Sequence, residues 1–389
     1  MEKEEYLERV RSLLPEIQAR AVECEQLRRL PDENFKAFQE QGLLRALQPA
    51  RWGGFELQPL ALYEAAILVG TVCPASAWVL SVVGVHSWQL ALFDDRAQED
   101  VWGEDTSVQI SSSYAPTGQV TRVDGGFQLK GRWSFSSGCD HCEWVFLGGL
   151  VAKESGSPTM YTFLIPRSDY EIEDTWHVAG LSGTGSKDIV VTEAFVPEYR
   201  THNLRDAFNL DSPGQAGNPG PSFRLPFGMV FPYGVSVPAL GTAMGALEIY
   251  RSAMLEKYNA FGDIKVSEDP FAQKRISEAA GEIAAARAEL NQTWESVWEI
   301  VVAGNSIPME LRARSRWTSA KIVQRCVRAV DILFEASGGR AIFLDNPMQR
   351  FFRDIHAIRA HAVNNPDSAA RVFGFSQLHP GETPKDLFV

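Results

Sequence analysis

Residues 131–138 hold aromatic and hydroxyl side chains in an order that suits a planar ligand. Trp133 and Phe135 alternate with other residues as in a β-strand, which then ends in a turn formed by Ser136, Ser137 and a glycine. Such a turn places hydroxyls and free backbone N–H groups beside an apolar wall, the combination that a flavin ring requires. An aromatic strand before a glycine turn is common in any sheet, so the prediction also rests on three other segments.

The first of these segments contains Trp78 and His86, which are eight residues apart. Two helical turns put them on roughly the same side of one helix, where an aromatic wall and a titratable group would face one cavity. The alternative, which this segment alone favours, is a core tryptophan and a hydrogen-bonded histidine.

The second segment, Ser111 to Tyr114, ends a predicted strand. Alternation directs Ser111 and Ser113 to one face and Ser112 to the other. A serine without a neighbouring base is a hydrogen-bond donor rather than a nucleophile. The sequence contains no G-x-S-x-G elbow, which argues against hydrolase chemistry.

The third segment places His361 after Arg353 and Asp354 near the end of a predicted helix. A histidine at such a position can titrate near neutrality, which suits proton transfer, although a lone histidine is more often structural. Residues 180–187 look like a phosphate loop, but Lys187 follows a serine and the segment precedes a strand. We expect a turn there, whose N–H groups are able to contact a flavin tail.

The overall composition excludes several classes of protein. The chain has 389 residues and a net charge of −12, which argues against nucleic acid and anionic membranes as partners. Its first residues are charged, so no secretory signal is expected, and the five scattered cysteines indicate reduced thiols in a cytoplasm. Cys139 and Cys142 enclose His141, but a zinc site needs a second ligand pair, so we expect no metal.

Three zones follow from the patterning along the chain: helices in residues 1–105, a β module in 106–205, and a helical bundle in 206–389. Short alternating runs between Gly, Pro and Asp turns predict an antiparallel sheet or small barrel, with strands at 119–123, 127–133, 145–151, 160–165 and 188–196. In the last zone, residues 206–225 are predicted to form a loop. Apolar residues then recur by threes and fours from Ile276 to Val301, which is typical of a bundle helix.

This order of helices, β module and long helices resembles the acyl-CoA dehydrogenase fold. Within that fold the chain is similar to the oxygenase components of two-component flavin monooxygenases, and most of all to those that hydroxylate secosteroid phenols. The resemblance runs nearly end to end and is densest at Val83–Trp88, Ile110–Pro116, Ser136–His141, Gly183–Ser186, Leu333–Gly338 and Arg350–Asp354. It implies an α+β chain that uses reduced flavin (FMNH2 or FADH2) and O2 to convert a phenol to a catechol.

The resemblance also implies the site residues. In this family the flavin pocket is lined by residues that match Trp78, Ser112, Ser113, Tyr114, Phe135, Ser136, Ser137, Gly339, Arg340, His361 and Ala362. The family places a histidine like His86 and a serine like Ser112 against the substrate phenol, and a serine like Ser137 near flavin N5. We expect His86 and Ser112 to withdraw the phenolic proton and His361 to donate a proton to the leaving oxygen. We expect Trp78, Trp133 and Phe135 to wall a dry pocket.

Three alternatives are kept open. An acyl-CoA dehydrogenase needs a glutamate base, and neither Gly228–Ser236 nor Arg359–His361 contains a carboxylate. A flavin oxygenase acting on indole, sulfur or an amine shares the scaffold, and so does a non-catalytic helical assembly protein. The sequence has no G-x-G-x-x-G unit after a strand, so we expect a separate NADH-dependent flavin reductase as partner. The long bundle seam indicates a homo-oligomer, and the family implies a tetramer.

Overall fold

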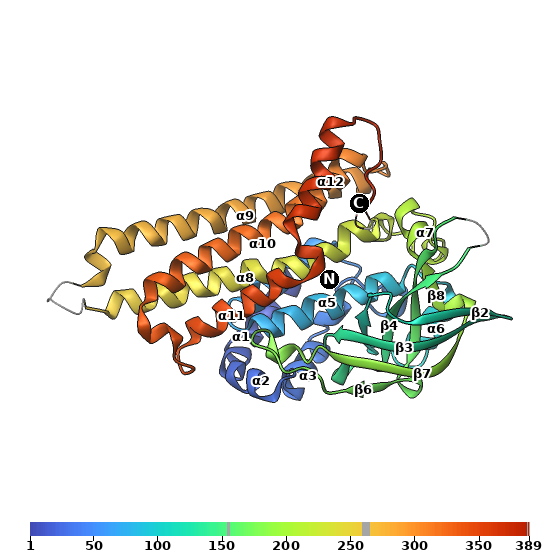
Figure 1. Ribbon diagram of the computed structural model, residues 1–389, viewed down its shortest axis with the longest axis horizontal. Helices are drawn as coiled ribbons and strands as arrows, with labels where there is room; N and C mark the ends of the chain where they lie inside the picture. The colour runs from blue at the N-terminus through green and yellow to red at the C-terminus, as the bar shows by residue number, and fades with distance from the viewer. Residues whose placement is uncertain (154–155, 259–264, 387, 389) are drawn as a thin grey trace.

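The computed structural model describes residues 1–153, 156–258, 265–386 and 388. Figure 1 shows a bundle of long helices on the left, two β-sheets on the right, and α5 between them. The helices of the N-terminal part are α1 (Lys3–Ala19), α2 (Ala21–Leu27), α3 (Asp32–Glu40), α4 (Pro59–Gly70), α5 (Pro74–Leu90) and α6 (Asp95–Trp102).

The central part consists of two four-stranded sheets, with strand orders β1-β4-β5-β8 and β2-β3-β7-β6. Alternate side chains of both sheets fill the shared core, among them Phe127, Val145 and Phe163. The strands are β1 (Ile110–Ser113), β2 (Gln119–Val123), β3 (Gly126–Ser136), β4 (Trp144–Val151), β5 (Thr159–Pro166), β6 (Glu171–Glu173), β7 (Lys187–Pro197) and β8 (Thr201–Asn203).

The predicted strands are present and the prediction of antiparallel sheets is confirmed, with one parallel pair in addition. Strand β1 pairs with β4 in parallel, with Ile110 opposite Trp144. The β2–β3 hairpin, which belongs to the other sheet, lies between these two strands along the chain. The chain therefore crosses to the second sheet and returns to run beside β1 in the same direction.

The C-terminal part is a bundle built on three long antiparallel helices. An Asp269 cap, which accepts a hydrogen bond from the backbone N–H of Phe271, and Pro270 at the first helical position fix the start of α9. The helices are α7 (Leu204–Asn209), α8 (Phe227–Glu256), α9 (Pro270–Val302), α10 (Met309–Ser337), α11 (Pro347–Ala360) and α12 (Pro366–Leu378).

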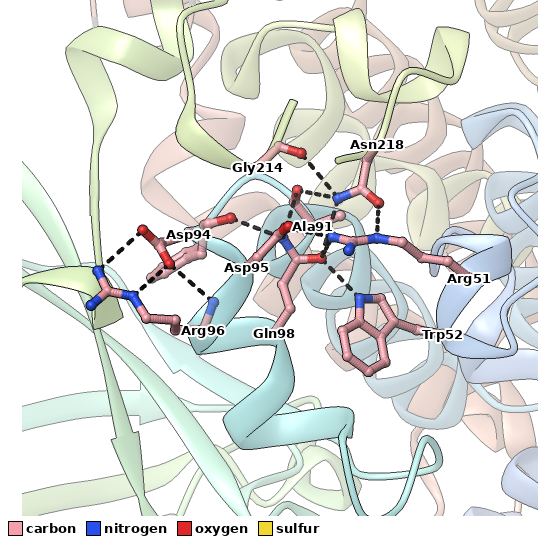
Figure 2. A network of polar contacts seen from close by, with 10 residues as sticks. Arg51, Trp52, Ala91, Asp94, Asp95, Arg96, Gln98, Gly214 and Asn218 are labelled. Carbon is pink, nitrogen blue, oxygen red and sulfur yellow. Dashed lines mark hydrogen bonds and ion pairs between the residues drawn. The ribbon is translucent and has the colours of Figure 1, made fainter. Parts of the chain in front are cut away.

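The prediction of a loop over residues 206–225 is partly wrong, because α7 covers its first residues and short 3-10 turns follow. A buried polar network fixes this segment to the N-terminal helices (Figure 2). The Asn218 amide donates to the Ala91 carbonyl at 2.7 Å and accepts from Arg51 Nε at 2.8 Å. Gln98 Oε1 accepts from Trp52 Nε1 at 3.1 Å, and its Nε2 donates to the Phe93 carbonyl at 2.9 Å. The amides of Asn218 and Gln98 thus satisfy backbone carbonyls that follow α5.

Helices α4, α5 and α8 form the centre of the molecule, and every residue of α5 is buried. Gly241 of α8 lies so close to α4 that a Cβ atom there would be 2.3 Å from the Ile67 carbonyl oxygen. Within the described part of the chain, α8 is the one helix long and apolar enough to span a membrane, and 89% of its apolar window is buried in the protein. Helices α4 and α5 come before the predicted boundary at residue 105, and α8 comes after the one at residue 205, yet they pack against each other. The division into three domains therefore stays a prediction.

Candidate active site

Helix α5 positions the two residues at the centre of the predicted site. Trp78 and His86 are eight residues apart, which corresponds to about 12 Å along the helix axis. Both side chains contact the β module, His86 at Ile110 of β1 and Trp78 at Ser137 beyond β3. The helix therefore holds two clusters of functional groups at opposite ends of one apolar surface.

His86 is 1% exposed and its hydrogen-bonding state is fixed by its neighbours. Its Nδ1 atom lies 2.5 Å from the Ile110 carbonyl oxygen, which can only accept, so Nδ1 carries the proton. Burial lowers the pKa of His86 to about 4, so the ring is neutral near pH 7. The remaining Nε2 lone pair is buried and has no hydrogen-bond partner among the described residues. His86 Nε2 is therefore a buried proton acceptor that receives no hydrogen bond from the described residues.

Ser112 and Tyr114 lie beside His86 on the same side of β1. The Tyr114 ring is 6.1 Å from the His86 ring and its hydroxyl donates to Gln89 Oε1, while the neighbouring Ser112 hydroxyl lowers the pKa of Tyr114 against the larger effect of burial, which raises it. Ser113 points to the other face and donates to the Ser134 carbonyl at 2.6 Å. The structure thus brings His86, Ser112 and Tyr114 together.

Aromatic rings surround this end of the site. The Tyr114 ring is 5.5 Å from that of Phe227 and 4.9 Å from that of Phe231, in edge-to-face geometry. Phe388, near the C-terminal end of the chain, lies 6.3 Å from Phe231, and Phe146 lies 5.7 Å from His86. This wall suits an apolar aromatic ligand.

The second cluster is a row of hydrogen-bonded hydroxyls that starts at Trp78. Trp78 Nε1 donates to Ser137 Oγ at 3.0 Å, and Ser137 Oγ lies 2.7 Å from Ser186 Oγ. Ser186 Oγ lies 2.7 Å from Thr184 Oγ1, which donates to the Leu181 carbonyl at 2.8 Å. All four side chains are buried or nearly so.

Phe135 is 67% exposed and has a backbone φ of +71°, an unusual conformation for an aromatic residue. Its ring lies edge-on against Trp176 at 6.0 Å. Ser136, by contrast, is fully buried and its Oγ has no partner in the described part of the chain. The expectation that Trp133 would wall the pocket is wrong, because its ring lies in the core between the sheets and donates to the Gly148 carbonyl at 2.8 Å.

His361 caps the end of α11 and its ring lies edge-on to Trp78 at 5.6 Å. The expectation that its position at a helix end would keep it titrating near neutrality is wrong. Desolvation lowers the pKa of His361 to about 4. Its Nδ1 accepts from the backbone N–H of Val363 at 3.3 Å, so the neutral ring carries its proton on Nε2. It is therefore a hydrogen-bond donor rather than a cation.

Gly339 and Arg340 do not join these clusters within one copy of the chain. Both are exposed in the loop before α11, where Arg340 pairs with Asp345. Helix α11 has 14 residues and separates that loop from His361 by about 21 Å. Ala362 follows His361 directly and is exposed. Roles in flavin binding for Gly339, Arg340 and Ala362 stay predictions.

The two clusters fit a flavin in the chemistry of their groups. The exposed Phe135 ring and the Trp78 ring supply apolar surface, while the Ser137 hydroxyl and the His361 Nε2–H supply polar contacts. No group of three or more His, Cys, Asp or Glu side chains is arranged to hold a metal in the ranges that the structure describes. Glu248 is the first carboxylate that follows residues 228–236, where a dehydrogenase would carry its base, and it is exposed and pairs with Arg251 at 2.8 Å.

Several residues of the site are absent from the sequence-based prediction. Gln89 holds the Tyr114 hydroxyl, Thr184 and Ser186 continue the hydroxyl row, and Asp354 accepts from the backbone N–H of Leu181 at 2.6 Å. Residues 184–186 show two hydroxyl side chains on either side of a glycine in the sequence, but this pattern alone predicts only a turn. Only the fold shows that these hydroxyls meet Ser137.

Comparison with known proteins agrees with this geometry. Residues 233–366 match the family described as acyl-CoA dehydrogenase, C-terminal domain. The chain is 44% identical over 373 residues to the flavin-dependent monooxygenase oxygenase subunit HsaA of Rhodococcus jostii (strain RHA1), covering 96% of this chain and 98% of the relative. It is 36% identical over 371 residues to the oxygenase component of p-hydroxyphenylacetate 3-hydroxylase from Acinetobacter baumannii, covering 95% and 87%.

A solved structure gives the same result for the fold. The crystal structure of 3-HSA hydroxylase from Rhodococcus sp. RHA1 superposes on this chain with a TM-score of 0.95 and 42% identity, covering 99% of each chain. The two backbones therefore agree over the helical parts and over both sheets.

Proposed function

This chain belongs to the oxygenase subunits of flavin-dependent monooxygenases, and from that premise we propose that it hydroxylates a polycyclic phenol such as a secosteroid to a catechol. The new hydroxyl enters ortho to the existing one. Two relatives support a phenolic substrate, namely 3-HSA hydroxylase from Rhodococcus sp. RHA1 and p-hydroxyphenylacetate 3-hydroxylase from Acinetobacter baumannii.

The buried lone pair of His86 Nε2 carries this proposal. A phenol with a pKa of about 10 is mostly protonated at pH 7 and is a weaker carbon nucleophile than its phenolate. A neutral imidazole that faces the phenol accepts the proton as the ring reacts, which increases the electron density on the ortho carbon. The Ile110 carbonyl holds the His86 tautomer that makes this possible.

Ser112 and Tyr114 are proposed to orient the phenol against His86. Both hydroxyls lie on the His86 side of β1, and the Gln89 amide fixes the Tyr114 hydroxyl. The aromatic wall of Phe227 and Phe231 then packs against the remaining rings of the substrate and excludes water from them.

The reduced flavin, when bound, supplies two electrons that, with O2 and the phenol, yield catechol, water and oxidised flavin. We assign its pocket to Trp78, the Ser112–Tyr114 strand end, Phe135 and the serines that follow. We infer that Ser137 contacts the reactive edge of the ring and that His361 Nε2–H donates a hydrogen bond to the departing oxygen; the Trp78–Ser137 hydrogen bond and the His361 tautomer support these roles. These side chains keep water away and hold protons at defined atoms.

The partners are proposed from the same reasoning. A separate NADH-dependent flavin reductase supplies the reduced flavin, since the described elements include no parallel βαβ unit for a dinucleotide.

We also propose that the chain forms a homo-oligomer, which the family implies is a tetramer. Exposed apolar side chains gather near the loop that carries Gly339 and Arg340, namely Ile342, Phe343 and Leu344, and a neighbouring copy would bring this loop to a flavin. The free cysteines fit a reducing cytoplasm.

The test is a coupled assay with reductase, NADH and FMN or FAD over a substrate panel. A 3-hydroxy-secosteroid and simpler phenols should yield catechol with little hydrogen peroxide. The matching methyl ethers, which cannot lose a proton, should yield only peroxide. Equal hydroxylation of the ethers, or of indole and sulfide substrates only, would overturn the phenol assignment.

A further inference from the structure

The hydroxyl row beside Trp78 has a single direction that its distances determine. At one end, the indole N–H of Trp78 can only donate, so Ser137 Oγ accepts at 3.0 Å. At the other end, the Leu181 carbonyl can only accept, so Thr184 Oγ1 uses its hydrogen there at 2.8 Å. The two hydroxyl contacts between these ends are both 2.7 Å, which requires one hydrogen in each.

The hydrogens of the middle residues follow by elimination. Because the Thr184 hydrogen is used at Leu181, the contact between Thr184 and Ser186 takes the hydrogen of Ser186. Because the Ser186 hydrogen is then used, its contact with Ser137 takes the hydrogen of Ser137. The row runs from Trp78 through Ser137, Ser186 and Thr184 to the Leu181 carbonyl, and each hydroxyl donates once.

This direction leaves Ser137 with one vacant acceptor position and no hydrogen to give. Its oxygen accepts from Trp78, donates to Ser186, and keeps one lone pair. Ser137 is 9% exposed and is two residues from the open ring of Phe135. A group that binds against Ser137 is therefore favoured if it offers a hydrogen and disfavoured if it offers a lone pair.

The backbone of the loop keeps the row in place. Leu181 and Gly185 both have left-handed φ angles, +56° and +55°, which turn the chain sharply on either side of Thr184. The Asp354 carboxylate accepts from the Leu181 N–H at 2.6 Å, and the Gly138 N–H donates to the Thr184 carbonyl at 2.9 Å. The loop is thus tied both to α11 and to the turn that carries Ser137.

We propose that Ser186 and Thr184 are positioning residues that hold the Ser137 hydroxyl as an acceptor, so that the pocket binds reduced flavin in preference to oxidised flavin. Reduced flavin carries a hydrogen on N5, whereas the N5 atom of oxidised flavin is an acceptor. This inference rests on the proposed function and on the placement of Ser137 at N5. It gives a physical reason for an oxygenase to take flavin only in the reduced state that a reductase delivers.

The experiment measures dissociation constants for oxidised and reduced FMN and FAD by anaerobic fluorescence titration. In Ser186→Ala the Ser137 hydrogen is free to turn toward oxidised N5, so the preference for reduced flavin should fall about 3–10-fold, the effect of one hydrogen bond. Thr184→Val should shift the preference in the same direction, because Ser186 then donates back to Ser137. A tenfold shift appears as about 30 mV in the two-electron potential of the bound flavin.

Ser182→Ala is the matched control, because Ser182 lies in the same loop but donates to the Val178 carbonyl at 3.1 Å, outside the row. It should leave the preference unchanged. Ser137→Ala should weaken the binding of reduced flavin and leave the binding of oxidised flavin unchanged. If Ser137→Ala has this effect while Ser186→Ala and Thr184→Val match the wild type, the positioning role is refuted and Ser137 remains a contact. If Ser137→Ala has no effect, the row does not face N5. Failure of the wild type to bind reduced flavin would refute the proposed function instead.

Discussion

Replacing His86 by asparagine removes the proposed base while keeping the hydrogen bond that fixes it. The asparagine amide N–H is able to replace His86 Nδ1–H as the donor to the Ile110 carbonyl, but no lone pair remains at the Nε2 position. His202→Asn is the matched control, because His202 is also 1% exposed and has a pKa lowered to about 3, but contacts Ser212 and Phe93.

The size of the effect follows from the ionisation of the substrate. At pH 7 a free phenol with a pKa of about 10 is about 0.1% phenolate, so hydroxylation by the variant should fall on the order of 10³-fold, within the range for a general base. The variant should recover about tenfold for each pH unit up to pH 9 as solution phenolate increases. The wild type should stay level down to about pH 5, because the His86 pKa is lowered to about 4 and only protonation below that removes the acceptor.

The assay is a single turnover of enzyme, pre-reduced flavin and phenol mixed with aerated buffer at about pH 5 to 9. Catechol is measured by liquid chromatography and hydrogen peroxide by a peroxidase-coupled dye. In His86→Asn, peroxide should rise as catechol falls, while His202→Asn should match the wild type within about threefold. A wild-type catechol yield in His86→Asn at pH 7, or a variant profile that does not change with pH, would refute the role of His86.

Three further predictions concern stability. Burial raises the pKa of Asp354 to about 7, so the folded state keeps a proton that the unfolded chain loses above about pH 4. Relative to Asp354→Asn, the free energy of unfolding of the wild type should fall by up to about 1.4 kcal/mol per pH unit as pH rises toward 7, and should level off above it. Urea midpoints of both proteins at about pH 5 to 8 measure this difference. Asn218→Ala removes one of the two donors to the Ala91 and Gly214 carbonyls and the acceptor of Arg51 Nε, and should cost about 1–3 kcal/mol in the same urea titrations. An unchanged midpoint would contradict the network in Figure 2. Leu290→Ala opens a cavity in the fully buried seam of α9 and should cost about 2–5 kcal/mol, whereas a change under about 1 kcal/mol would indicate a solvated helix face.

The parts of the fold that sequence predicts well are those set by local patterning. The apolar positions from Ile276 to Val301 identify α9 because a bundle helix must bury one continuous stripe. The turn at Asp124 and Gly125 identifies the β2–β3 hairpin because only a few residues favour such a turn. Strands β6 and β8 have three residues each, too few for alternation to be visible. The parallel pairing of β1 with β4 depends on residues far apart in the chain.

The candidate site divides in the same way. The spacing of Trp78 and His86 is a local property of one helix and predicts that both lie on roughly one side of it, and in the structure both side chains contact the β module. The low pKa of His361 depends on burial by other elements, and sequence position alone gives no measure of it. Trp133 was misplaced because alternation along a strand does not reveal which face is the core. The hydroxyl row joins three separate segments and exists only in the folded chain.

The most direct test of the account is a single turnover of a phenol under ¹⁸O2 with pre-reduced flavin. The account predicts a catechol that carries one ¹⁸O atom ortho to the original hydroxyl, formed in wild type and lost to labelled peroxide in His86→Asn. A hydroxyl that carries oxygen from water, or peroxide as the sole product of every phenol offered to the wild type, would contradict it.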